Sequence, residues 1–326
     1  RIKFYVNGIQ VTSFESATYP SQNADLNISS TATQLIGQQN SSLYFDGYLA
    51  EVHFTDGTAY DADAFGELKN GVWVAKTPDV TYGTNGFHLS LEPQLPSVSG
   101  DYLVVGGGGG AGGYGGAGGG GGFREFTNAT IYKGYPYPLT VGLGGSGAPN
   151  RNTRASNGGD SVFVITAAGG GGGGSDNANV YTASINDGAD GGSGGGSSYA
   201  APNIGGSGNT PSVSPSQGND GGVGGVSTYV YGGAGGGAGG VGGAFTPAGN
   251  AGNGGAGQTS SITGVSVGYA GGGGGGVNAT VSGGSATDGG GAGNVLAIGS
   301  NGEANKGGGA GAGWSATGAS GGSGVV

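Results

Sequence analysis

The segment YLVVGGGGGAGGYGGAGGGGGF, residues 102–123, sets the character of most of the chain. Four apolar or aromatic residues that favour β-strands lead directly into two glycine runs, which meet at Tyr114. Each glycine inside a helix costs about 0.5–1 kcal/mol relative to alanine, so this segment cannot form a stable α-helix. The sequence therefore predicts a short strand followed by extended glycine structure.

Glycine is distributed unevenly along the chain. Of the 89 glycines in 326 residues, eight lie in residues 1–99 and 81 lie in residues 100–326. Collagen is excluded, because glycine does not recur every third residue and only 11 prolines are present. The composition changes at a proline-punctuated linker near residues 93–97. We therefore expect two domains, residues 1–96 and residues 97–326.

Charge and residue usage exclude several classes of function. The chain has no cysteine, which removes disulfides, zinc fingers and thiol catalysis. Its net charge of −10 argues against nucleic-acid binding, and no apolar run approaches the 18 residues of a membrane-spanning helix. The chain begins at Arg1 without methionine, so we expect an excerpt of a longer polypeptide. A structural or binding protein, exported or carried on a particle, is the expectation.

Strand-like apolar runs recur before the glycine runs, which start at residues 106, 169, 232, 271 and 307. A flexible linker has no reason to repeat this arrangement, so the repeats indicate architecture. Glycine can form the left-handed polyproline II type of helix, with three residues per turn and a rise of about 3.1 Å. Such helices have no internal hydrogen bonds, and every N–H must pair with a neighbour. We therefore expect a domain of laterally packed polyglycine II helices with short β-strands.

Residues 1–96 have the pattern of antiparallel β-structure. Asn7-Gly8 separates two β-prone runs, which is a strong hairpin signal. The run 43–54 is aromatic and β-branched, and residues 72–74 and 87–91 are further expected strands. Only residues 61–67 have the pattern of a helical turn. The expected fold class is all-β, a partial jelly-roll β-sandwich followed by the glycine-rich domain.

Both halves also resemble known families. FYVNGIQVTSF (residues 4–14) and YFDGYLAEVHFTDG (residues 44–57) resemble the concanavalin A-like (laminin-G-like) jelly roll of phage tail and virion proteins, over residues 1–92. This likeness implies the C-terminal part of a sandwich whose relatives often bind carbohydrate. GGDSVFVITAAGGGGGG (residues 158–174) and the segment quoted first resemble the glycine-rich tip adhesins of T-even-type phage long tail fibres. In those adhesins, loops on a polyglycine II sandwich contact the bacterial surface.

The resemblance implies a function in virion attachment. We expect a phage tail-fibre or tail-tip adhesin, carried on the virion and extracellular, that binds a bacterial surface glycan or outer-membrane protein. Other virion tail proteins are expected partners, and a homotrimer or the tip of a trimeric fibre is the expected assembly. The alternative is a purely structural virion or extracellular filament protein. An enzyme is not expected, because no carboxylate pair suited to glycoside hydrolysis is distinguishable.

Aromatic residues in polar loops are the candidate binding residues. Tyrosine offers rigid amphipathic contact area at low entropic cost, which suits recognition of sugars or protein loops. The alternative is that these side chains only cover the glycine lattice. Four candidates lie in the loop 175–204: Tyr181, Tyr199, Asn177 and Asn179. Phe245 lies in the loop 244–263, and Tyr114 lies between the glycine-rich segments 106–113 and 115–122.

Metal and nucleophile signals are weak. Asp56, Asp61 and Asp63 fall in one loop and are candidate calcium ligands, although calcium needs six or more oxygen ligands. His53 and His88 have no cysteine or histidine at ligand spacing, so zinc is not expected. The G-x-S-x-G pattern of residues 191–195 lacks the strand-to-helix context of a nucleophile elbow, so we do not expect a hydrolase.

Overall fold

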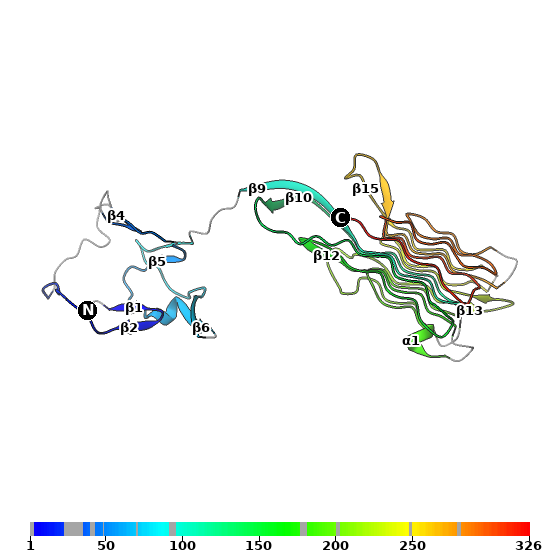
Figure 1. Cartoon of the computed structure of the whole chain (residues 1–326), viewed down its shortest axis with the longest axis horizontal. Coiled ribbons are helices and arrows are strands. Elements are labelled where there is room, and N and C mark those ends of the chain that lie inside the picture. The colour runs from blue at the N-terminus through cyan, green and yellow to red at the C-terminus, as the bar shows by residue number, and fades with distance from the viewer. Residues whose placement is uncertain are drawn as a thin grey trace. The chain divides into compact units, whose positions relative to one another are not determined.

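The structure, a computed structural model, describes residues 3–22, 35–39, 43–47, 49–69, 71–90, 96–176, 181–199, 203–247, 250–278 and 282–326. It divides the chain into two compact units, Arg1–Gln94 and Leu95–Val326. Both consist of short strands and extended chain with very little helix (Figure 1), and the predicted all-β class is confirmed.

The described residues of the first unit form eight short strands in four antiparallel pairs. In its described part these pairs do not join into a larger sheet, and one 3₁₀ turn, η1 (Ala62–Ala64), falls inside the expected helical turn. The pairs are β1 (Phe4–Val6) with β2 (Ile9–Val11), β3 (Gln38–Gln39) with β4 (Leu43–Tyr44), β5 (Val52–Phe54) with β8 (Phe87–Leu89), and β6 (Gly66–Lys69) with β7 (Val72–Ala75).

The hairpin predicted at Asn7-Gly8 is confirmed. The register pairs Val6 with Ile9, which leaves Asn7 and Gly8 as a two-residue turn. Both turn residues have positive φ, 49° and 77°, as a type I′ turn requires. The apolar run 43–54 behaves differently, because Glu51 has a φ of 52° and β5 begins only after it. The run, which Asp46-Gly47 interrupts in the sequence, contains two short strands, β4 and β5.

The second unit combines hairpins with glycine tracts. Among its described residues, four antiparallel strand pairs connect or flank the tracts, and one short helix, α1 (Ala183–Asn186), lies in a loop. The pairs are β9 (Ser97–Val105) with β10 (Phe123–Tyr132), β11 (Ser161–Phe163) with β12 (Ile165–Ala167), β13 (Gly225–Val226) with β14 (Val230–Tyr231), and β15 (Gln258–Ser260) with β16 (Val267–Tyr269). The apolar run at 295–298 forms only an isolated bridge, from Val295 to Val277.

The hydrogen bonds of the tract 106–113 establish its helical period. Successive N–H groups donate to three different neighbouring segments in rotation, so that every third residue returns to the same neighbour. This period of three is that of a polyglycine II helix, and the predicted packed helices are confirmed. Toward the first neighbour, Gly106, Gly109 and Gly112 donate to Gly122, Gly119 and Gly116, respectively. Toward the second, Gly107 and Gly110 donate to Gly159 and Ser156, and toward the third, Gly108 and Ala111 donate to Gly322 and Ala319. All seven donor–acceptor distances are 2.8–3.0 Å.

Carbonyl groups complete the lattice around this central tract. Gly107 and Gly110 accept hydrogen bonds from Gly170 and Gly173, while other carbonyls accept from segments near residues 145–148 and 310. All of residues 106–113 are buried. At Gly108 a Cβ atom would overlap the carbonyl oxygen of Gly308, so the spacing between tracts admits only hydrogen at this position. Backbone packed directly on backbone forms the centre of the unit.

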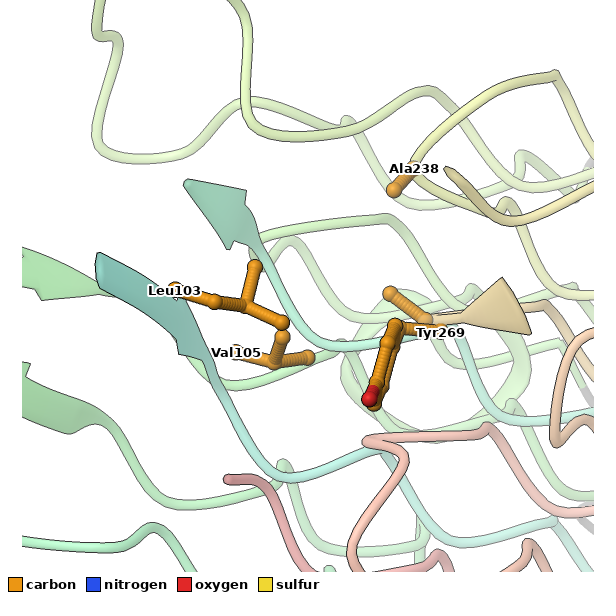
Figure 2. Packing of buried hydrophobic residues seen from close by; sticks show 5 residues of the cluster. Leu103, Val105, Ala238 and Tyr269 are labelled. Atoms are coloured by element: carbon orange, nitrogen blue, oxygen red, sulfur yellow. The ribbon is translucent and has the colours of Figure 1, made fainter. Parts of the chain in front are cut away.

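Conventional apolar clusters lie at both ends of the lattice. At the end where β9 enters, Leu103 and Val105 project toward Tyr269, with Ala238 beside them (Figure 2). At the other end, Tyr231 packs in a second cluster with other apolar side chains. We call this second end, where α1 and β13 lie remote from β9 (Figure 1), the distal end.

Candidate functional site

Three aromatic side chains meet at the distal end of the lattice. The ring centroid of Trp314 lies 4.9 Å from that of Tyr114 and 5.8 Å from that of Tyr199. Each residue directly follows a glycine-rich tract. The tract before Trp314 is hydrogen-bonded to the tract before Tyr114, and the tract before Tyr199 is hydrogen-bonded to the tract that follows Tyr114. All three side chains are partly exposed. We call Tyr114, Tyr199, Trp314 and the adjoining Arg151 the distal cluster.

Arg151 links the aromatic rings to a buried carboxylate. Its guanidinium lies 5.3 Å from the ring centroid of Tyr114 and forms an ion pair with Asp176. The Asp176 side chain is 1% exposed, whereas that of Arg151 is 37% exposed. Burial, reinforced by a hydrogen bond to Asp176, raises the pKa of the Tyr199 phenol far above its ordinary value. The cluster therefore presents neutral aromatic rings and one partly exposed cation.

Buried polar side chains fix the loops that carry this cluster. The Ser175 hydroxyl accepts a hydrogen bond from the Gly113 amide at 2.9 Å and donates to the Thr153 carbonyl at 2.7 Å. Asn186, at the end of α1, donates to the Ser175 carbonyl at 2.8 Å. Three loop segments are thus tied to the ends of the glycine tracts. A site on this scaffold is held in place before any ligand binds.

Two other candidate residues have different surroundings. Tyr181 is half-buried and donates a hydrogen bond to the Asp187 carboxylate at 3.0 Å; burial, and then this bond, raise the pKa of its phenol. Phe245 stacks on Tyr231, with ring centroids 6.0 Å apart, and packs against the distal apolar cluster. Phe245 therefore has a packing role. Asn177 and Asn179 lie outside the described residues.

Sequence reasoning placed the loop boundaries incorrectly. The segment 175–204, expected to be one loop, contains lattice residues: Gly194 and Gly196 donate to Asn219 and Ala117. Arg151, Asp176 and Trp314 were missed as site residues, because they are far apart in sequence and only the stacking of tracts brings them together. One sequence feature could have indicated Trp314 as a site residue: it is one of only two tryptophans in the chain.

The candidate calcium ligands do not form a site. Asp56 accepts hydrogen bonds from the backbone and side chain of Asn85, whereas Asp61 binds Lys3 and Tyr5. Asp63 is exposed. Within the described ranges, one group of acidic or histidine side chains is close enough to share a metal ion, and it contains none of these aspartates. That group contains Glu51, His53 and His88, so the fold brings together two histidines that have no companion ligand at close spacing in the sequence.

The serine of the G-x-S-x-G pattern is inaccessible. Ser193 is completely buried in the glycine lattice, and both histidines of the chain belong to the first unit. Within the described residues, no helix has the length and apolar character needed to cross a bilayer. The distal cluster offers surfaces for stacking and hydrogen bonding, which suit recognition of sugars and peptide loops.

Comparison with known proteins identifies one family. No curated protein matches the chain, and no solved structure matches it either. Residues 91–326 match a family model described as a glycine-rich domain. The match spans well over half of the chain and includes the whole lattice of hydrogen-bonded tracts. The chain belongs to the glycine-rich domain family.

Proposed function

We propose that this protein is an attachment protein of a phage tail fibre, and that the distal cluster contacts the bacterial surface. The expected receptor is a surface glycan or an exposed loop of an outer-membrane protein. The resemblance of both sequence halves to phage tail proteins supports this assignment. In this proposal the protein is extracellular, carried on the virion, and bound to other tail proteins through a trimeric fibre. The first unit would supply a jelly-roll module with structural or carbohydrate-binding roles.

One observation carries the proposal: three partly exposed aromatic rings and an arginine converge on the end of a rigid lattice. Aromatic and arginine side chains supply most of the energy in many binding sites, provided that their positions are fixed. The lattice fixes them through the backbone, so little conformational entropy is lost when a ligand binds. No covalent step is required for this role.

A cell-binding assay tests the proposal. The labelled chain would be titrated onto a panel of Gram-negative strains and onto their purified lipopolysaccharide and outer-membrane fractions. For a strain that binds, Trp314→Ala should weaken binding at least about 30-fold, the effect expected of a hot-spot aromatic residue. Tyr135→Ala is the matched control, because Tyr135 is 54% exposed and lies on the segment after β10, at the end opposite to the distal cluster.

The amide-exchange pattern of each variant establishes that its lattice is intact. Equal binding by wild type and Trp314→Ala, with intact lattices, would remove the distal cluster from the proposed function. Release of reducing sugar from the bound polysaccharide would indicate an enzyme instead.

A purely structural role is the second candidate. The ion pair between Arg151 and Asp176 and the hydrogen bond from Tyr181 to Asp187 satisfy polar groups of the distal loops internally. Side chains that are paired in this way could serve only to close the end of the lattice. In that case the panel would show no binding by wild type, and Trp314→Ala would lower the stability of the second unit instead.

A further inference from the structure

The sheet β5–β8 brings together the two histidines of the chain. Its register places His53 opposite His88, and their rings stack with centroids 4.2 Å apart and planes 13° apart. Glu51 immediately precedes β5. Its Oε2 atom lies 2.8 Å from Nε2 of His88 and 3.5 Å from Nε2 of His53. One potential ligand atom from each residue thus falls within 4.8 Å of the other two.

One of these ligand atoms is buried without a hydrogen-bond partner. The His53 side chain is 6% exposed, and its Nε2 atom has no hydrogen-bond partner among the described residues. A buried nitrogen that makes no bond is unfavourable and needs an explanation. The other ring nitrogen, Nδ1, lies 2.8 Å from the hydroxyl of Tyr82. Nε2 instead faces the carboxylate of Glu51 and the neighbouring imidazole of His88.

We propose that Glu51, His53 and His88 bind a divalent transition-metal ion, and that Zn²⁺ is the ion that this site takes. A tetrahedral zinc ion with ligands at about 2.0–2.1 Å separates its ligand atoms by about 3.3–3.4 Å. The separations of 2.8 and 3.5 Å between the Glu51 oxygen and the two Nε2 atoms lie close to this value. The imidazoles stack 13° from parallel, so both rings turn toward a common point when their Nε2 atoms bind one ion. Two imidazoles and one carboxylate suit zinc, whereas calcium and magnesium prefer oxygen ligands.

Tyr82 has a supporting role in this site. With Nε2 of His53 bound to the metal, Nδ1 carries the proton and its N–H donates a hydrogen bond to the Tyr82 hydroxyl oxygen. This hydrogen bond fixes the tautomer and the orientation of the ring. The Tyr82 ring also stacks near both histidine rings, at centroid distances of 6.0 and 6.4 Å. Three protein ligands leave one tetrahedral position for water.

The site would stabilise a unit with little apolar burial. Among the described residues of the first unit, no apolar side chain is fully buried. A metal ion that connects β5, β8 and Glu51 binds only when these segments are in place, so it favours the folded state. This inference concerns the first unit alone and does not depend on the proposed attachment function.

To test the proposal, Zn²⁺ is titrated into the full chain, and the NMR signals of the two histidine side chains are followed. The chain contains no other histidine and no cysteine, so the signals are unambiguous. We expect both imidazoles to shift together and to saturate at one equivalent, while Ca²⁺ leaves them unchanged. Co²⁺ should give the visible absorption of a tetrahedral site. Unchanged signals at millimolar Zn²⁺, or a shift of one histidine alone, would overturn the proposal.

Variants separate a metal site from nonspecific binding. His88→Gln changes a partly exposed side chain and should weaken Zn²⁺ binding at least about 100-fold, because one of three ligands is lost. Tyr82→Phe keeps the ring, removes the supporting hydroxyl, and should weaken binding about 10–100-fold. Glu67→Gln is the matched control, since this exposed carboxylate pairs with Lys69 instead. Equal zinc affinities for His88→Gln and Glu67→Gln would exclude the site.

Discussion

The two units of the chain achieve β-rich structure in opposite ways. In the first unit, short strands pair two by two, and apolar residues such as Val6 and Ile9 remain 62% and 74% exposed. In the second unit, glycine tracts pack backbone against backbone, and Val104 and Val105 are completely buried where β9 enters the lattice. The contrast shows that hydrogen-bonded backbone can take over much of the role that side chains have in an ordinary core.

The largest expected difference between the units is in amide exchange. Amides of residues 106–113 should exchange about 1,000-fold or more slowly than those of β1 and β2, because each lattice N–H is buried and opens only when neighbouring tracts separate. Hydrogen–deuterium exchange followed by mass spectrometry measures both regions in one sample. Similar rates in the two regions would contradict the packed lattice.

The second largest expected difference is in the loss of stability when one glycine of each unit is replaced by alanine. In Gly108→Ala the new Cβ meets the backbone of Gly308, which cannot rotate away, so we expect a loss of at least about 3 kcal/mol. Gly57→Ala has open space around it, and the positive φ of 84° should cost only about 1–2 kcal/mol.

Fluorescence can follow each unit separately, because the first contains Trp73 and the second contains Trp314. Urea unfolding of Gly108→Ala in a Trp73→Phe background reports on the lattice, and Gly57→Ala in a Trp314→Phe background reports on the first unit. If the two alanine variants lost equal stability, close backbone packing would not distinguish the units.

Two valine-to-alanine substitutions, one in each unit, test how much buried side chains contribute to stability. Val104→Ala should cost about 1.5–3 kcal/mol, because this side chain is completely buried against Phe126 and Phe163. Val6→Ala removes the same atoms from a side chain that is 62% exposed and should change stability by less than about 0.5 kcal/mol. The same single-tryptophan unfolding experiments measure both values, and a large loss for Val6→Ala would reveal burial in the first unit.

The smallest expected effect is alkaline destabilisation at the distal cluster. The folded pKa of Tyr199 is raised above its ordinary value of 10, so the unfolded chain loses this proton first as the pH rises. The stability contributed by the neutral phenol is complete below pH 10 and declines above it. Tyr199→Phe should therefore show a shallower fall in the melting temperature above pH 10. An unchanged slope would indicate that the Tyr199 phenol is solvated.

Local rules predicted several elements correctly. The turn at Asn7-Gly8 depends only on the positive φ values that these residues tolerate, and the prediction was right. The packed glycine tracts were also predicted correctly, because glycine has no side chain to hold neighbouring backbones apart. The run 43–54 contains two strands on either side of Asp46-Gly47, and only the left-handed conformation of Glu51 is not indicated by the sequence. Of the four candidate aromatic residues, Phe245 packs against the distal apolar cluster, and a binding role for the candidates stays a prediction.

The sequence by itself determined the type of backbone structure: tight turns in the first unit and threefold glycine helices in the second. These choices depend on the φ and ψ angles that each residue tolerates, which is a local property. Only the tertiary structure decided which tracts are neighbours, and hence that Arg151, Tyr199 and Trp314 meet at one end. It also decided that His53 faces His88 across a strand pair. Glycine tracts are nearly identical to one another in sequence, so their order in the lattice depends on the connecting loops and the apolar clusters at their ends.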